Sequence, residues 1–528
     1  MKKAITLLLA AAMCTSMLAA CGGGGESSTA STESTGSTGG ETASSGESSS
    51  GEEGSLKMAE ETEVVFAFPT SGTYTDEGID MVQEEINNIT VPNDNVRVRF
   101  EAITMSNYTN QVGMMMAGGE KLDVLGFIGN YSTMLAKNQL MNLSPYMDTY
   151  GQGIREAVGD EFLKATSNHG DIYAIPTLNG KAAVLNVILR TDVIEDNNIS
   201  LDGLYQASTW DEYMEVLDEV GNIFAQMKAA EPDMACTSSM GNSLLFTTCL
   251  PQFDKLNDNY GVLMDGETTV VNYYESDEYA ELVGIAHDWY EKGYVLQDAA
   301  TTTEAQNTYF QAGVVMGGFV SGEEGQAEQI TNATGVDVTC IKLLQPTIAT
   351  ADVNGIGFAI SATSEEPEAS MLWLDQMYTN PDVVNLLDWG VEGVHYELQD
   401  DGTIDFPEGV DATTSSYNMN MDWFFGNQFL SHIFGYGRDT TVYERLAENN
   451  RTANFSPAMG FTYDSTPIRN ELTEVTNVHS EYAPGLETGT TDPATELPKF
   501  IEALKNAGID KIIAEKQTQL DAWLAEQQ

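Results

Sequence analysis

Residues 22–55 consist only of Gly, Ser, Thr, Glu and Ala, so this segment offers no large apolar side chain to a hydrophobic core. Burial of so little apolar surface does not offset the entropy lost on ordering, and we expect the segment to be disordered. At about 5 to 6 Å times the square root of its length, it reaches about 30 to 35 Å. The composition therefore predicts a linker over residues 21–56 and a folded part that begins at residue 57.

The N-terminal 20 residues are organised like a secretory signal, because Lys2 and Lys3 precede an apolar run and then small residues. The run is interrupted by hydroxyl side chains and is shorter than the about 20 apolar residues of a membrane span. The tetrapeptide LAAC at residues 18–21 resembles the lipobox of bacterial lipoproteins. This resemblance implies that residues 1–20 are a lipoprotein signal peptide, and that Cys21 is lipidated and anchored at the extracellular face of the cell membrane.

The chain is strongly acidic, with 80 Asp and Glu against 23 Lys and Arg. Loss of Lys2 and Lys3 with the signal leaves 21 basic residues and a net charge of −59. Such a chain is repelled by nucleic-acid phosphates and by anionic lipid headgroups, so both kinds of electrostatic partner are excluded. Membrane attachment then depends on lipid, and two acyl chains hold firmly where one binds only marginally.

Three cysteines remain in the folded part, namely Cys236, Cys249 and Cys340. This number is too small for a disulfide scaffold in about 470 residues. Cys236 and Cys249 form a disulfide in one interpretation and are buried free thiols in the other, and the sequence leaves both open.

From residue 57 the chain reads as an α/β protein. The length exceeds that of one ordinary core and predicts two lobes. Apolar and amphipathic patterns alternate between strands and helices at its start, and Thr75 is placed to cap the first helix. The expected order is strand 63–68, helix 75–89, strand 96–103, helix 107–119 and strand 122–129. This alternation favours a parallel sheet with helices on its faces.

Motifs for catalysis and for cofactors are mostly absent. The sequence has no glycine-rich phosphate loop, no zinc-ligand spacing and no G-x-S-x-G elbow, and we expect no cofactor and no metal. Paired carboxylates are harder to dismiss, because glycoside hydrolysis needs only two of them at the right distance. A surface-anchored carbohydrate-active enzyme therefore stays open as an alternative.

Five stretches, taken in order, resemble one known family. They are residues 117–147, 170–178, 309–319, 389–398 and 460–523. In this order they resemble an extracellular solute-binding lipoprotein of a bacterial ABC importer, in the carbohydrate-associated, maltose-binding-like cluster (family 1). The resemblance implies a non-enzymatic α/β protein with two lobes, crossing hinge strands and a ligand cleft between the lobes. It also implies that the permease and the ATPase are separate proteins.

The same resemblance implies a division of the chain. Lobe 1 would comprise residues 57–178 with about 306–355, and lobe 2 would comprise residues 179–305 with about 356–528. Residues 172–178 would form the first crossing, residues 309–319 would return the chain to lobe 1, and residues 354–361 would cross again.

A sugar receptor needs aromatic planes for the ring faces and polar side chains for the hydroxyls. Such residues are expected at the carboxyl ends of strands, in a glycine-punctuated loop after a helix, and near the hinge. The ligand-binding candidates are Ser71, Tyr74, Asn130, Tyr131, Asn179, Asn242, Trp389 and Glu392. Capping, turn formation or core packing is the competing role for each. Trp423 and Tyr463 are weaker candidates from lobe 2, whereas Trp289 and Trp373 lie on apolar helix stripes and are expected in the core.

These observations predict a lipid-anchored receptor that captures an oligosaccharide or a sugar derivative and hands it to a membrane permease. The alternatives are the carbohydrate-active enzyme and a receptor for peptides or other solutes.

Overall fold

The computed structural model describes residues 56–322, 325–435 and 437–527. The predictions for the signal peptide, for Cys21 and for the linker up to residue 55 lie outside these ranges. No helix within the described ranges is both long enough and apolar enough to cross a membrane.

The first sheet has five strands in the order β3-β1-β4-β12-β7, and β1, β3 and β4 run parallel as predicted. Its strands are β1 (Thr62–Thr70), β3 (Val96–Thr104), β4 (Val124–Ile128), β12 (Ile356–Ile360) and β7 (Ile175–Pro176). Helix α1 (Asp76–Asp94) connects β1 to β3, and the Thr75 side chain accepts a hydrogen bond from the Gly78 amide at 3.1 Å. The predicted N-cap is therefore confirmed.

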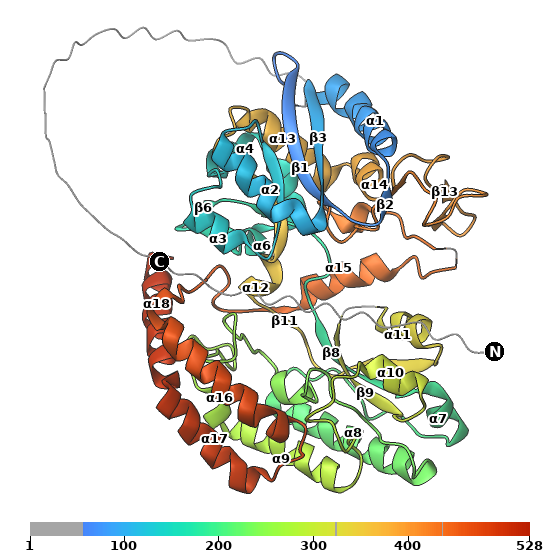
Figure 1. Cartoon of the computed structure of the whole chain (residues 1–528), viewed down its shortest axis with the longest axis vertical. Coiled ribbons are helices and arrows are strands. Elements are labelled where there is room, and N and C mark those ends of the chain that lie inside the picture. Colours follow the sequence, from blue (N-terminus) through green and yellow to red (C-terminus); the bar gives the residue numbers. More distant parts are fainter. Residues whose placement is uncertain (1–55, 323–324, 436, 528) are drawn as a thin grey trace, which may run out of the picture. The chain divides into compact units, whose positions relative to one another are not determined.

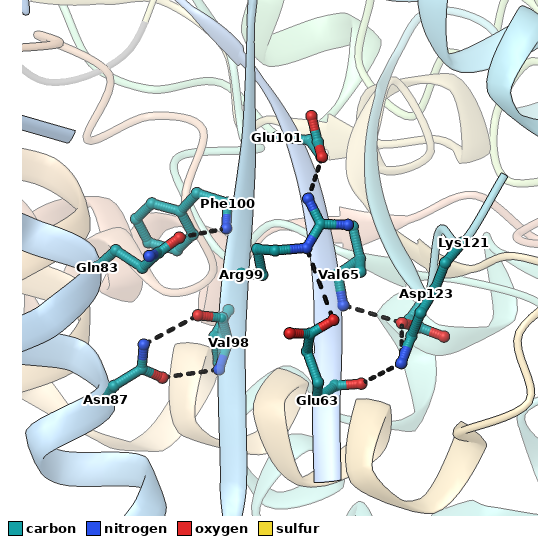
Figure 2. A network of polar contacts seen from close by, with 10 residues as sticks. All are labelled: Glu63, Val65, Gln83, Asn87, Val98, Arg99, Phe100, Glu101, Lys121 and Asp123. Atoms are coloured by element: carbon teal, nitrogen blue, oxygen red, sulfur yellow. Dashed lines mark hydrogen bonds and ion pairs between the residues drawn. The ribbon is translucent and has the colours of Figure 1, made fainter. Parts of the chain in front are cut away.

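Polar side chains of α1 satisfy three outer backbone groups of β3, the edge strand (Figure 2). The Asn87 side chain accepts from the Val98 amide at 2.7 Å and donates to the Val98 carbonyl at 3.0 Å. Gln83 Oε1 accepts from the Phe100 amide at 2.7 Å. The side-chain amides of Asn87 and Gln83 fix the distance between α1 and the sheet, because each forms hydrogen bonds that the backbone of a neighbouring strand would otherwise form.

Helices cover both faces of the first sheet (Figure 1). One face packs against α1, α4 (Ser144–Tyr150), α5 (Gln152–Val158), α13 (Pro367–Thr379) and α14 (Pro381–Trp389). The other face packs against α2 (Met105–Gly118) and α3 (Tyr131–Ala136). Trp373 of α13 is fully buried, with its ring 5.5 Å from that of Phe66. Its predicted place in the core is confirmed.

The second sheet has the antiparallel order β10-β8-β9, formed by β8 (Val184–Arg190), β9 (Gly317–Gly322) and β10 (Val338–Lys342). Helices α8 (Trp210–Ala230) and α9 (Asp277–Glu291) contribute to its hydrophobic core. Three C-terminal helices also contribute: α16 (Arg469–Glu487), α17 (Pro493–Ala507) and α18 (Ile509–Glu526). Helix α8 begins with a capping box of Thr209 and Glu212. Trp289 is 3% exposed in this core, as predicted.

The predicted division between the lobes is wrong for two segments. Residues 306–355 do not return to the first lobe, because β9 and β10 pair with β8. Residues 356–389 do not belong to the second lobe, because β12 pairs with β4 and the helices after it pack on the first sheet. Glycines in β9 and β12 allow close contact with the neighbouring backbone, which a larger residue would prevent. A Cβ on Gly317 would lie 2.8 Å from the Ile188 carbonyl oxygen, and one on Gly357 would lie 2.4 Å from that of Ile175.

Three crossing segments join the lobes, and two of them pair with each other. The first runs over residues 177–183 and the second over residues 343–355. The third follows α15 (Val442–Thr452) and contains β16 (Asn454–Phe455). Strand β16 pairs in parallel with β11 (Thr347–Ile348) of the second segment.

Cys236 and Cys249 are free thiols rather than a disulfide. Cys236 is fully buried, its Sγ donates to the Phe224 carbonyl at 3.3 Å, and burial raises its pKa to about 12. Of the two interpretations left open by the sequence, the structure supports free thiols, of which Cys236 is buried and Cys249 is half-buried.

Candidate functional site

A cavity of about 360 Å³ is lined from both lobes, and we call it the aromatic cavity. The second lobe contributes α11 (Gln326–Thr334), and the first contributes the end of α14 and the chain that follows it. Helix α15, which leads to the third crossing segment, forms a further wall. The aromatic lining residues are Trp389, Trp423, Phe434 and Tyr443, and polar ones include Gln329, Asn420, Asp422 and Gln428.

Trp389 is a fixed wall of this cavity. Its indole nitrogen donates to Ser431 Oγ at 2.8 Å and to the His432 carbonyl at 3.1 Å. Its ring lies 5.2 Å from the Phe434 ring, and only 6% of the residue is exposed. The side chain therefore combines a structural role with a place in the lining.

A hydrogen-bonded group centred on Asp422 forms the polar part of the wall. Asp422 Oδ2 accepts from the Tyr443 hydroxyl at 2.5 Å and from Gln428 Nε2 at 2.9 Å. Burial, and then the charge of Asp422, raise the pKa of Tyr443, so this phenol remains a hydrogen-bond donor. Burial, and then the charge of Asp422, also raise the pKa of the fully buried Asp388. The wall thus holds planar rings beside oriented donors and acceptors.

One pair of opposite charges lies at the margin of the cavity. Arg445 Nη1 lies 2.6 Å from Asp439 Oδ2. Hydrogen bonds from Thr441, followed by one from Arg445, lower the pKa of Asp439 to about 2. This carboxylate is therefore ionised and already engaged near neutral pH.

Several predicted site residues lie at or next to the aromatic cavity. Trp389 lines it, and Asn179 Nδ2 donates to the Trp423 carbonyl at 2.8 Å. Tyr74 lies in β2 (Thr73–Tyr74), which pairs with β15 (Tyr417–Asn418), two residues before the lining residue Asn420. Ser71 is exposed in the turn before β2.

The other predicted site residues lie elsewhere. Tyr131 is 4% exposed, donates to the Thr166 carbonyl at 2.6 Å and lines a second cavity, of about 670 Å³, together with Trp523. Asn130 precedes α3, and its buried Oδ1 lacks a hydrogen-bond partner among the described residues. Asn242 adopts a left-handed turn in the second lobe with φ of 63°. Glu392 is exposed. Within the described ranges, neither Asn242 nor Glu392 lines either cavity.

Sequence reasoning missed Asn420, Asp422, Gln428 and Tyr443, and it assigned Trp423 to the wrong lobe. The stretch "NMNMDWFFGNQF" (418–429) mixes aromatic and amide side chains, which is the composition expected of a sugar-binding wall. That composition was the available signal. No group of three or more His, Cys, Asp or Glu side chains suited to a metal occurs in the part of the chain that the structure describes.

Comparisons with known proteins agree with this architecture. Residues 457–525 match a family model described as "Domain of unknown function (DUF3502)". A carbohydrate ABC transporter substrate-binding protein of Streptococcus pneumoniae serotype 4 is 24% identical over 473 residues, which are 85% of this chain and 89% of that protein. The crystal structure of an N-glycan transport solute binding protein from Streptococcus pneumoniae covers 88% of this chain and 100% of its own, at 21% identity and a TM-score of 0.69.

This chain has an α/β periplasmic-binding-protein-like fold, similar to that of solute-binding proteins of ABC importers. A second structure of the same pneumococcal solute-binding protein, in complex with Man5GlcNAc, matches over 88% of this chain and 99% of its own, at 21% identity and a TM-score of 0.55. The predicted resemblance to solute-binding proteins is confirmed.

Proposed function

We propose that this protein is a lipid-anchored extracellular receptor that captures an oligosaccharide between its lobes and delivers it to an ABC permease. The observation that carries the proposal is the aromatic cavity, which is lined from both lobes by planar rings and by polar side chains. The description of the pneumococcal relative as a carbohydrate transporter component, and the glycan complex of the related solute-binding protein, support the same ligand class.

The chemistry of the cavity suits a sugar. Trp423 and Trp389 present apolar ring faces, and the apolar face of a pyranose packs against such planes. Gln329, Asn420 and the Asp422 group supply donors and acceptors for hydroxyls. Because α11 and the Trp423 segment belong to different lobes, closure of the hinge would bring both sets of groups onto one ligand.

A melting screen against glycans and peptides tests the function. A ligand at about 100 times its Kd stabilises the folded state by about 2.7 kcal/mol, which a thermal shift detects. We expect stabilisation by oligosaccharides such as Man5GlcNAc and recovery of the glycan unchanged. Release of a hydrolysed product, or stabilisation by peptides alone, would contradict the proposal.

Replacing Trp423 by alanine is expected to weaken glycan binding by at least about tenfold, because truncation of a central aromatic contact costs about 1.4 kcal/mol or more. The measurement is calorimetric titration with the glycan found in the screen. Trp523→Ala is the matched control, since Trp523 lines the second cavity, and we expect its affinity to change by less than about twofold. Weaker binding by Trp523→Ala with unchanged binding by Trp423→Ala would indicate that the glycan binds in the second cavity instead.

Cys21→Ala is expected to release the protein from the membrane into the medium with unchanged glycan affinity, because the proposed anchor is separate from the folded part. Cell fractionation followed by titration of the released protein measures both effects. Retention of the variant in the membrane fraction would show that Cys21 is not the anchor.

A further inference from the structure

Asn450 holds the first crossing segment through both the oxygen and the nitrogen of its side-chain amide. It lies near the end of α15 and is 6% exposed. Its Oδ1 accepts from the Lys181 amide at 2.8 Å and from the Ala182 amide at 3.2 Å. Its Nδ2 donates to the Asn179 carbonyl at 2.7 Å. One side chain thereby satisfies three backbone groups of a segment that is in neither sheet.

The same residue is joined through the backbone to the other two crossing segments. Two residues after α15 ends, the Asn454 amide donates to the Pro346 carbonyl at 2.9 Å, and the Ser456 amide donates to the Ile348 carbonyl at 2.9 Å. These bonds fix the third segment to the second. Asn450 is therefore a side chain that ties the first segment to this pair.

Helix α15 also reaches the aromatic cavity. Tyr443, seven residues before Asn450, lines the cavity and donates to Asp422. Seven residues are about two turns of an α-helix, so the two side chains lie on the same helix face. We call Asn450 and the backbone groups of Asn179, Lys181 and Ala182 that it bonds the clamp. On the other side of the clamp, Asn179 Nδ2 donates to the carbonyl of Trp423, another lining residue. The clamp is thus connected to the cavity wall on both sides.

We propose that Asn450 is a positioning residue that couples the ligand-binding wall to the crossing segments, so that all three segments move together when the lobes close. This inference rests on the proposed function, in which a glycan binds in the aromatic cavity. A clamp of this kind reduces the number of hinge conformations in the ligand-free protein, and the ligand then meets a population that is competent to close.

The test compares Asn450→Ala with Asn87→Ala in the full chain. Asn87 is a matched control, because it is also a buried amide that bonds to backbone groups, but it lies on α1 at the edge of the first sheet. The first readout needs no ligand. Labels attached through unnatural amino acids at exposed Glu84 of α1 and exposed Glu502 of α17 report the distribution of distances between the lobes.

We expect Asn450→Ala to broaden this distribution and to weaken Man5GlcNAc binding at least about fivefold, whereas Asn87→Ala leaves both within about twofold of the wild type. Equal effects of the two variants would overturn the coupling role. Failure of the wild type to bind any glycan would overturn the proposed function alone, since the distance distributions still decide the clamp.

A second variant covers a folding defect in Asn450→Ala. Asn450→Asp keeps an oxygen that accepts from the Lys181 and Ala182 amides but loses the donor to Asn179. We expect it to give a distribution of intermediate width. A distribution as narrow as that of the wild type would contradict the assigned role of the donor bond.

Discussion

Replacing Phe500 by alanine is expected to lower the free energy of unfolding by about 3 to 5 kcal/mol, the range for removal of a fully buried phenylalanine ring. Phe500 lies on α17 and has no exposed surface. Its ring is 5.0 Å from that of Tyr274 and stacks 5.7 Å from that of Tyr482. Truncation leaves a void between helices that belong to one rigid core, so little of the loss is recovered by relaxation.

Urea unfolding at a fixed pH measures this loss. Leu398→Ala is the control for loss of apolar side-chain atoms, because Leu398 is 56% exposed, and we expect a change within about 0.5 kcal/mol. Similar values for the two variants would mean that α17 does not belong to the second-lobe core. The expected result would give the segment matched by the domain of unknown function a defined structural role, as part of that core rather than an appendage.

Glu487→Gln is expected to remove a pH dependence of stability of about 3 kcal/mol. Glu487 ends α16, is 4% exposed, and burial raises its pKa from 4.5 to about 7. Because the folded pKa lies above the unfolded one, its contribution to stability is fully present below about pH 4.5 and is lost as the pH rises through about 7. At about 1.36 kcal/mol for each pKa unit, the wild type loses about 3 kcal/mol that the glutamine variant retains.

The groups that face Glu487 set the design of this experiment. They are Ser243, Lys255, Tyr279 and His479, with His479 Nε2 at 3.9 Å from Glu487 Oε1. Burial lowers the pKa of His479. The contribution of His479 to stability is therefore lost as the pH falls, whereas that of Glu487 is lost as the pH rises. The test therefore compares the free energies of unfolding of the wild type and of Glu487→Gln at each pH from 5 to 8.5. Glu481 is exposed on the same helix, and we expect the pH dependence of the free energy of unfolding of Glu481→Gln to match that of the wild type. A Glu487→Gln variant with the same pH dependence as the wild type would refute the prediction.

Local features of this fold were predictable from the sequence, because local chemistry determines them. The Thr75 cap depends on a hydroxyl three residues before an amide, and the parallel arrangement of β1, β3 and β4 follows from the alternation of strands and helices. The buried positions of Trp289 and Trp373 follow from helical periodicity.

Strand partners were not predictable in the same way. Strands β9 and β12 are both short apolar runs with glycine, and nothing in either run indicates which sheet it joins. Their neighbours, β8 and β4, are more than 100 residues away in the sequence. The choice between sheets depends on tertiary contacts at Gly317 and Gly357, which only the folded chain reveals.

The candidate site shows the same limit. The rule that ligands bind at the carboxyl ends of strands led to Asn130 and Tyr131, but the Tyr131 side chain turns to the Thr166 carbonyl and to the second cavity. Asp422 and Tyr443 are 21 residues apart in the sequence, and their hydrogen bond forms only when α15 packs beside residues 428–430. Trp389 was accessible to sequence reasoning because it ends a clear helix.

The side-chain amides that α1 places against β3 have a consequence for this protein at high concentration. An edge strand with open backbone groups is a template on which another molecule adds a strand, and this is a common route to aggregation. Asn87 and Gln83 already occupy the Val98 and Phe100 positions of that template. At this edge, copies of the protein are therefore protected against pairing of one sheet with another.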